Sequence, residues 1–233
     1  MNDIFVYPLQ NSKEYKDIIN CINNNKGSLL INGLLAVQKP HIAYSMYRDL
    51  NRQTIFITNS DLEAKKVYDD LSFYMKDKVE YIGFQDILFY HLDAKDRSEE
   101  AKRLKVLLKL AKGENIILVT SIEAVMRKYI PKEILLENIY TYKIGDVINL
   151  EKLSETLVNL GYERVSKIEG FGQFSIRGGI VDIFSLEYNN PIRMELFDDE
   201  IDSIRTFDVF SQKSIEKINK FSITPSREFI YPE

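Results

Sequence analysis

Short apolar runs alternate with helical patterns through the first half of the chain. Apolar, β-branched and aromatic residues predict four buried strands, at residues 28–34, 53–59, 79–84 and 115–121. Between these runs, apolar residues recur at helical spacing around residues 40–50, 61–75 and 98–112. Strand–helix alternation of this kind predicts a mostly parallel sheet covered by helices.

Capping residues mark the ends of two of these helices. Ser60 precedes an acidic first turn, and Ser98 begins a segment in which acidic residues lead and lysines trail. Gly113 follows that second segment and suits the left-handed conformation that ends many helices. We therefore expect Ser60 and Ser98 to be N-caps.

The pattern changes after a short predicted helix at 121–129, where Pro131 breaks the chain. One further helix is predicted up to Gly161, and the rest is rich in short strands. The sequence thus predicts a parallel-sheet α/β domain over residues 1–127 and a smaller α+β domain with an antiparallel sheet over residues 128–213. Residues 214–233 are expected to return to the first domain and to begin a region that is missing.

Composition narrows the function classes. The 233 residues are 45% hydrophobic and 28% charged, as in ordinary globular proteins, and the formal net charge of −4 argues against a chain built mainly to grip nucleic acid. The single cysteine, Cys21, rules out an internal disulfide framework and a cysteine-based zinc site. With only two histidines, a histidine-cluster metal centre is improbable. We expect no metal and no cofactor. Without a membrane-spanning run or a signal peptide, a cytoplasmic location is expected.

A degenerate phosphate loop lies between the first predicted strand and its helix. A P-loop has the pattern G-x-x-x-x-G-K-[ST], and the aligned residues here are Gly33, Gln38, Lys39 and Pro40. Gln38 adds a side chain where phosphate must approach bare backbone, and Pro40 lacks both the N–H and the hydroxyl that binds Mg²⁺. No apolar strand ends in an acidic pair that could hold Mg²⁺. We therefore expect a degenerate P-loop, RecA-like domain with no catalytic residue.

The second half carries a specific signature. Residues 161–208 contain GYER, then GQFSIRGGIVDIF, then IRMELFDDEIDSIRTFD. This signature closely resembles the N-terminal UvrB-like module of the bacterial transcription-repair coupling factors (Mfd), and the excinuclease helicase UvrB shares it. The resemblance extends more weakly to TSIEAVMRKYIP and ITPSREFIYP. It implies that the first domain is like UvrB domain 1a and the second like UvrB domain 2.

Two departures favour the coupling factor over the excinuclease helicase. UvrB has an intact P-loop and a long DNA-probing hairpin, whereas the interval GFQDILFYHLDAKDRSEE is too short for such a hairpin. The resemblance implies a module without chemistry that recruits the excinuclease protein UvrA to stalled transcription. It also implies that a C-terminal domain masks this surface, that the parent protein is an ATP-dependent DNA translocase, and that RNA polymerase and DNA are contacted only through other domains.

The resemblance also points to docking residues. Strand alternation in IRMELF puts Ile192, Met194 and Leu196 on one face, which we expect to be core. The opposite face takes Arg193, Glu195 and Phe197, and Arg177 of the preceding strands can share it. By the family motif, Arg177, Arg193 and Phe197 fall on positions that contact UvrA, with Glu195 beside them.

Other interpretations of these residues stay open. Each arginine can be solvated or can pair across strands with Glu195, and Phe197 can be buried under the helix at 150–160. The acidic residues at 198–202 are expected to form a solvated turn rather than a metal site. A nucleotide-binding DNA-repair helicase fragment, in which Lys39 binds phosphate, is the alternative function. A purely structural role, holding the parent protein closed, is the third.

Overall fold

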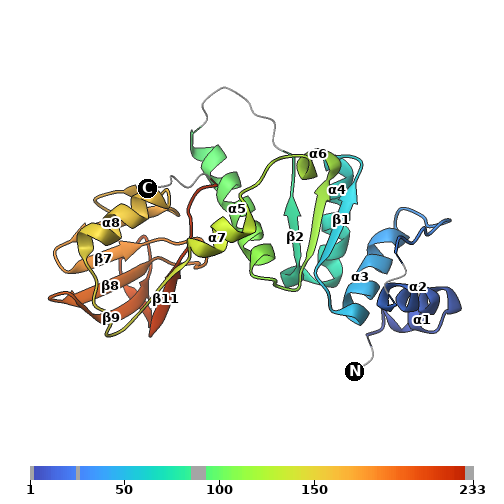
Figure 1. Cartoon of the computed structure of the whole chain (residues 1–233), viewed down its shortest axis with the longest axis horizontal. Coiled ribbons are helices and arrows are strands. Elements are labelled where there is room, and N and C mark those ends of the chain that lie inside the picture. The colour runs from blue at the N-terminus through green and yellow to red at the C-terminus, as the bar shows by residue number, and fades with distance from the viewer. Residues whose placement is uncertain (1–2, 25–26, 85–92, 229–233) are drawn as a thin grey trace. The chain divides into compact units, whose positions relative to one another are not determined.

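The computed structural model describes residues 3–24, 27–84 and 93–228, without the side chains of 93–98. The chain divides into two compact units (Figure 1). The first comprises Met1–Phe89 and Gly113–Lys128, and the second comprises Tyr90–Lys112 and Tyr129–Glu233. The domain boundaries expected after residues 127 and 213 stay predictions.

The first unit is built on a three-stranded parallel sheet with the strand order β1-β3-β2. The strands are β1 (Thr54–Thr58), β2 (Val79–Ile82) and β3 (Ile117–Ser121). The helices of the unit are α1 (Tyr7–Gln10), α2 (Lys13–Asn23), α3 (Gln38–Leu50), α4 (Asp61–Tyr74) and α6 (Ile122–Val125), with the 3₁₀ turn η1 at Lys76–Lys78. Three of the four expected strands and the helices expected around 40–50 and 61–75 are confirmed.

Helix α4 shows how local sequence builds this unit. The Ser60 hydroxyl accepts a hydrogen bond from the Glu63 backbone N–H, so Ser60 is the N-cap that was expected. Ala64, Val67 and Leu71 lie on one side of the helix and are buried in the core with β2 and β3. This apolar stripe, rather than the many charges of the helix, packs α4 onto the sheet.

Two expectations from the sequence are wrong. Residues 28–34 form no strand and are mostly exposed, with Leu30 82% exposed, although their apolar run predicts a buried strand. Helix α5 extends over Asp93–Ala111 and thus starts five residues before Ser98, which is not its N-cap.

Gly113 follows α5 with a φ of +73°, as expected of a helix-ending glycine. The middle of the interval judged too short for a hairpin, residues 85–92, lies outside the described residues.

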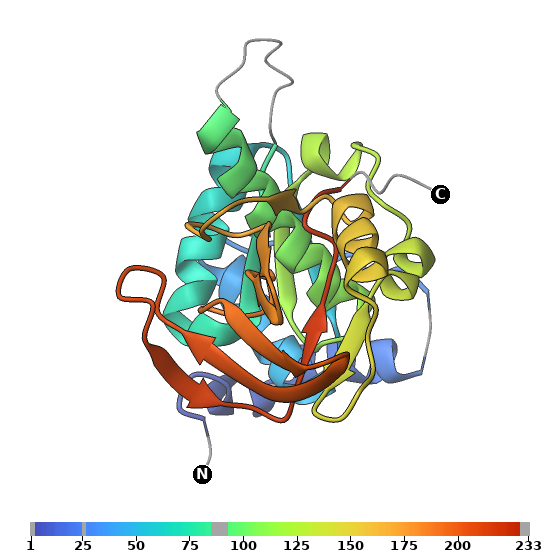
Figure 2. The same ribbon diagram turned by 90° about the vertical axis from the view of Figure 1, so that its left-hand side faces the viewer.

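The second unit contains a six-stranded sheet with the order β10-β9-β8-β7-β6-β5, and a two-stranded pair of β11 and β4. Its strands are β4 (Tyr140–Lys143), β5 (Glu163–Arg164), β6 (Gln173–Arg177), β7 (Ile180–Ile183), β8 (Ile192–Phe197), β9 (Glu200–Phe207), β10 (Ser214–Lys217) and β11 (Lys220–Ile223). All neighbours pair antiparallel except β5 and β6. The strands curl strongly, as the orange and red ribbons in Figure 2 show.

Among the residues that the structure describes, three helices belong to this second unit: α5, α7 (Lys132–Glu137) and α8 (Leu150–Asn159). Leu104 and Leu108 of α5 are buried with Leu135 of α7 in one cluster. Helix α8 has the Asn149 side chain as its N-cap and is followed by Gly161, whose φ is +86°. The helix predicted up to Gly161 is therefore confirmed.

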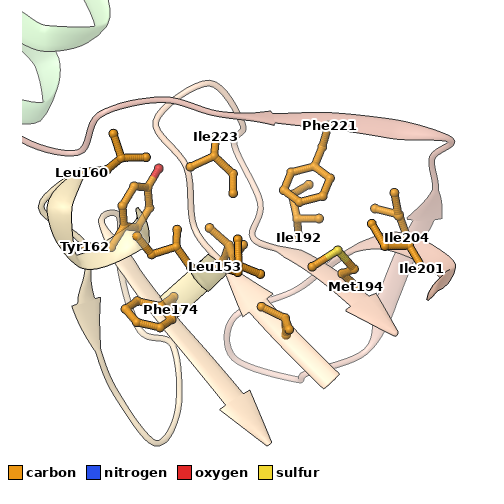
Figure 3. Close-up of a cluster of buried hydrophobic side chains, with 13 residues drawn as sticks. Leu153, Leu160, Tyr162, Phe174, Ile192, Met194, Ile201, Ile204, Phe221 and Ile223 are labelled. Atoms are coloured by element: carbon orange, nitrogen blue, oxygen red, sulfur yellow. The ribbon is translucent and has the colours of Figure 1, made fainter. Parts of the chain in front are cut away.

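One face of the six-stranded sheet forms the main core of the second unit. Leu153 and Leu157 of α8 are buried with Ile192 and Met194 of β8. Figure 3 shows Leu153, Ile192 and Met194 among the side chains of this cluster, which also includes Phe174 of β6. The core face predicted for β8 is confirmed, with Leu196 partly buried against the same cluster. The opposite face of this sheet, called here the outer face, is therefore left for other contacts.

The fold class expected from the sequence is confirmed. A parallel α/β sheet lies in the first unit, and a separate antiparallel sheet with fewer helices lies in the second. Within the described ranges, none of the helices combines the length and the apolar character that crossing a bilayer requires.

Candidate functional site

The outer face carries two cross-strand rows of residues, all of them polar except Ile180. The strand registers place one row across five strands, Ser175–Asp182–Arg193–Arg205–Lys217, and a second row across four strands, Arg177–Ile180–Glu195–Ser203. Side chains directly opposite each other in antiparallel strands point to the same face, so the members of each row are neighbours. The sheet thus brings Arg177, Arg193 and Glu195 together, as their sequence spacing predicts.

Asp182 is the buried centre of this arrangement. Asp182 lies in the otherwise apolar strand β7, and its side chain is only 2% exposed. One carboxylate oxygen accepts a hydrogen bond from Arg193 Nε at 2.6 Å, and the other accepts from Arg193 Nη2 and Arg177 Nη2, both at 2.8 Å. A carboxylate taken out of water is stable only with such partners. Asp182 therefore fixes the positions of both arginines.

Arg193 is held on several sides. Besides Asp182, its Nη2 donates to the Gln212 side-chain oxygen at 3.1 Å, and its guanidinium carbon lies 4.3 Å from the centre of the buried Phe207 ring. The hydrogen bonds with Asp182 raise the pKa of Arg193 above its ordinary value, against the opposing effect of burial. Only 14% of its side chain is exposed. The small part of Arg193 that solvent reaches is therefore held in one orientation.

Glu195 pairs with Arg205 instead of Arg193. Arg205 Nη1 donates to Glu195 at 2.9 Å, its Nη2 donates to the second carboxylate oxygen, and the Ser203 hydroxyl donates at 3.0 Å. Partial burial raises the pKa of Glu195, but the hydrogen bonds from Arg205 and Ser203 outweigh it, so the pKa lies below its ordinary value. The cross-strand pairing considered between Arg193 and Glu195 is therefore replaced by two other ion pairs.

Phe197 lies at the end of β8 and is 82% exposed. The alternative that it is buried under the helix at 150–160 is wrong, because α8 packs on the opposite face of the sheet. The turn that follows places Asp198 in the left-handed region, with a φ of +60°, and the strand returns as β9. Aspartate tolerates this conformation better than most residues, which explains the aspartate at position 198. No cluster of three potential metal ligands occurs in the described part of the chain.

The residues aligned with a phosphate loop belong to the first unit. Gly33 has a φ of +83°, and Gln38 is the first residue of α3, where its side-chain oxygen accepts from the Leu35 backbone N–H at 2.9 Å. Lys39 is exposed, and Pro40 is buried at the third helical position. Pro40 thus stands in the first turn, where a missing N–H costs nothing. Gln38 uses its side chain to stabilise the entry to its own helix.

Sequence reasoning missed three charged residues of the two rows: Asp182, Arg205 and Lys217. Asp182 had a usable signal, because a single carboxylate in an apolar four-residue strand requires a buried cation. Arg205 and Lys217 depend on the pairing of β9 with β8 and β10, and their positions follow only once the register is known.

Comparisons with known proteins agree with this architecture. The family model of the UvrB interaction domain matches residues 141–229. The transcription-repair-coupling factor of Bacillus subtilis (strain 168) is 33% identical over 223 residues, which is 95% of this chain and 19% of that protein. Those of Staphylococcus epidermidis (ATCC 12228) and Staphylococcus aureus (Mu50) are each 33% identical, over 87% and 89% of this chain and 17% and 18% of theirs.

The second unit, with its antiparallel sheet and ion-paired outer face, therefore contains the segment that matches the UvrB interaction domain. The resemblance inferred from the sequence is confirmed: over most of its length the chain is related to the bacterial transcription-repair coupling factors. The chain spans about one fifth of the length of the curated relatives that it matches.

Proposed function

We propose that this chain is the non-catalytic UvrB-like part of a transcription-repair coupling factor, and that its outer face recruits the excinuclease protein UvrA for nucleotide excision repair. The observation that carries the proposal is Phe197, an aromatic side chain 82% exposed on the same sheet as the fixed arginines. Aromatic residues and arginine are the residue types that most often dominate the energy of protein interfaces.

The ion pairs of the outer face favour binding to another protein. Arg193 and Arg177 are oriented before any partner arrives, so less side-chain freedom is lost on binding. Arg177 keeps half of its side chain exposed while one nitrogen binds Asp182. Its planar guanidinium can therefore meet a carboxylate of a partner in a defined direction. Glu195, two residues before Phe197 on β8, is held in turn by Arg205 and Ser203.

The proposal assigns catalysis to other parts of the parent protein. Gln38 and Pro40 stand where a phosphate loop needs a bare backbone and a hydroxyl, so we propose a degenerate P-loop without ATP chemistry in this chain. The ATP-dependent translocase activity and the contacts with RNA polymerase and DNA then belong to other regions of a cytoplasmic parent protein. A C-terminal domain of that parent covers the outer face until remodelling exposes it.

Calorimetric titration of UvrA with this chain tests the proposal. We compare wild type with Phe197→Ala, Arg177→Ala and the control Phe73→Ala, whose ring is 75% exposed in the first unit. Saturable binding that Phe197→Ala weakens about 30-fold, as expected for an interface anchor, supports recruitment. Equal binding of Phe197→Ala and the control, in folded proteins, contradicts the role of the outer face.

A further inference from the structure

A second exposed aromatic side chain lies beyond the residues that the family signature indicates. Phe210 is 91% exposed in the turn Asp208–Lys213 between β9 and β10. Leaving a phenylalanine in water forgoes the stabilisation that its burial would give, so the fold itself gains nothing from this ring. Phe197 is also largely exposed, and it lies near the other end of β9, where it pairs with Glu200.

The turn that carries Phe210 is extensively hydrogen-bonded. An Asp208 carboxylate oxygen accepts from the backbone N–H and the hydroxyl of Ser211, both at 2.7 Å. The Gln212 backbone N–H donates to the Asp208 carbonyl at 2.8 Å, and the Gln212 side chain donates to the Val209 carbonyl at 2.7 Å. These bonds hold the backbone on both sides of Phe210. The ring is therefore presented on an ordered turn rather than on a loose loop.

Gln212 connects this turn to the outer face. Its φ is +58°, and its side-chain oxygen accepts from Arg193 Nη2 at 3.1 Å, beside the Phe207 ring on which that guanidinium stacks. The Phe210 turn is thus anchored to the same arginine that Asp182 holds. A partner that contacts Arg193 from solvent meets this turn on the β9–β10 side.

The charge of the outer face indicates what such a partner presents. Its two cross-strand rows contain the cations Arg177, Arg193, Arg205 and Lys217 against the carboxylates Asp182 and Glu195. Within these two rows the surplus is two positive charges, whereas the carboxylates of residues 198–202 lie at the Phe197 end of β9. Lys217 is exposed at the edge of the first row, next to Arg205. The face therefore favours a partner segment that is acidic and also carries an apolar group.

We propose that Phe210 is a second anchor of the docking surface, and that the Phe210 turn and Lys217 bind an acidic, partly apolar segment of UvrA at the opposite end of β9 from Phe197. This inference rests on the proposed function. It places a contact on β9, β10 and their turn, and Gln212 is the positioning residue that keeps the turn against Arg193.

Calorimetry with UvrA tests it through four proteins: wild type, Phe197→Ala, Phe210→Ala and the control Phe73→Ala. Because Phe210 is almost fully exposed, its truncation leaves the fold intact, which circular dichroism verifies. We expect Phe210→Ala to weaken binding at least ~10-fold and Phe210→Leu to recover part of the loss. Lys217→Ala should weaken binding less, and its effect should shrink at high salt because exposed charges are screened.

The role of Gln212 has its own measurement. Asparagine accepts the left-handed conformation but is one methylene shorter, so Gln212→Asn keeps the turn and loses the reach to Arg193. We expect Gln212→Asn to weaken binding by itself, and to weaken it much less in the Phe210→Ala background, because both changes remove the same contact. Additive losses contradict positioning by Gln212.

The outcomes separate this inference from the function on which it rests. If wild type does not bind, recruitment by this chain is wrong and the inference fails with it. If Phe197→Ala loses binding while Phe210→Ala matches Phe73→Ala, recruitment stands and the second anchor is wrong. Losses in both variants, with binding retained in the control, establish the second anchor.

Discussion

Arg193 binds Asp182 through two hydrogen bonds, from Nε at 2.6 Å and Nη2 at 2.8 Å, across the pairing of β7 with β8. The same carboxylate also accepts a hydrogen bond from Arg177 of β6. One buried charge on β7 thus organises two arginines on the neighbouring strands β6 and β8. Because the carboxylate is 2% exposed, it is a structural requirement of the sheet as well as a determinant of its outer face.

The first prediction concerns this carboxylate. Asp182→Asn keeps the shape but removes the charge that balances Arg193 in a mostly buried position. Breaking a buried pair by removing one partner costs about 3–5 kcal/mol, so we expect a loss of unfolding free energy of that order. Urea unfolding measures it, with the exposed Asp202→Asn on β9 as the control. Equal stability of the two variants contradicts the structural role of Asp182.

The second prediction concerns pH. Hydrogen bonds from Arg205 and Ser203 hold the pKa of Glu195 below its ordinary 4.5, although partial burial acts to raise it. A carboxyl with a lowered pKa in the folded state contributes stability above its unfolded pKa and loses it as the pH falls through the folded value. We expect wild type to lose more stability than Glu195→Gln on acidification below about pH 4.5. Thermal unfolding at several pH values measures the effect, with the exposed Glu216→Gln as the control. If the stabilities of all three proteins fall in parallel as the pH is lowered, the prediction is contradicted.

The third prediction concerns the glycine that ends α8. Gly161 has a φ of +86°, and a Cβ added there would lie 2.7 Å from Arg227 Cγ. A non-glycine residue in this region costs about 1–3 kcal/mol before any clash. Gly161→Ala should therefore lower the unfolding free energy by at least that amount. Gly170→Ala, where a Cβ would meet no atom within 4 Å and φ is not positive, should change little. A larger loss of unfolding free energy in Gly170→Ala than in Gly161→Ala would contradict this explanation.

The fourth prediction concerns nucleotide. Gln38 is committed to the start of α3 through its hydrogen bond with Leu35, and Pro40 supplies no hydroxyl for Mg²⁺. Titration with Mg²⁺–ATP should therefore give no saturable binding, and Lys39→Ala should behave as wild type. Saturable, Mg²⁺-dependent binding that Lys39→Ala abolishes would favour the helicase-fragment alternative.

The sequence predicts those parts of the fold that depend on local patterns. Ser60 caps α4, Gly113 and Gly161 end their helices, and the apolar alternation of β8 separates core from outer face. These features need only neighbouring residues. The segment 28–34 fails because an apolar run does not specify a partner strand, and β1 pairs with β3 instead.

The candidate site, too, is predicted by local patterns only in part. Strand periodicity alone places Arg193, Glu195 and Phe197 on one face. Which carboxylate each arginine binds depends on the registers of β7 with β8 and of β8 with β9, which no local pattern contains. For this reason the pairing of Arg193 with Asp182, and that of Glu195 with Arg205, became visible only in the structure.

The most direct test of the account is the affinity of this chain for UvrA, measured by calorimetry for wild type, Phe197→Ala and Phe73→Ala. We predict saturable binding by wild type, the same affinity for Phe73→Ala, and about 30-fold weaker binding for Phe197→Ala. Absence of binding by a folded wild-type chain, or an unchanged affinity in Phe197→Ala, would contradict recruitment through the outer face.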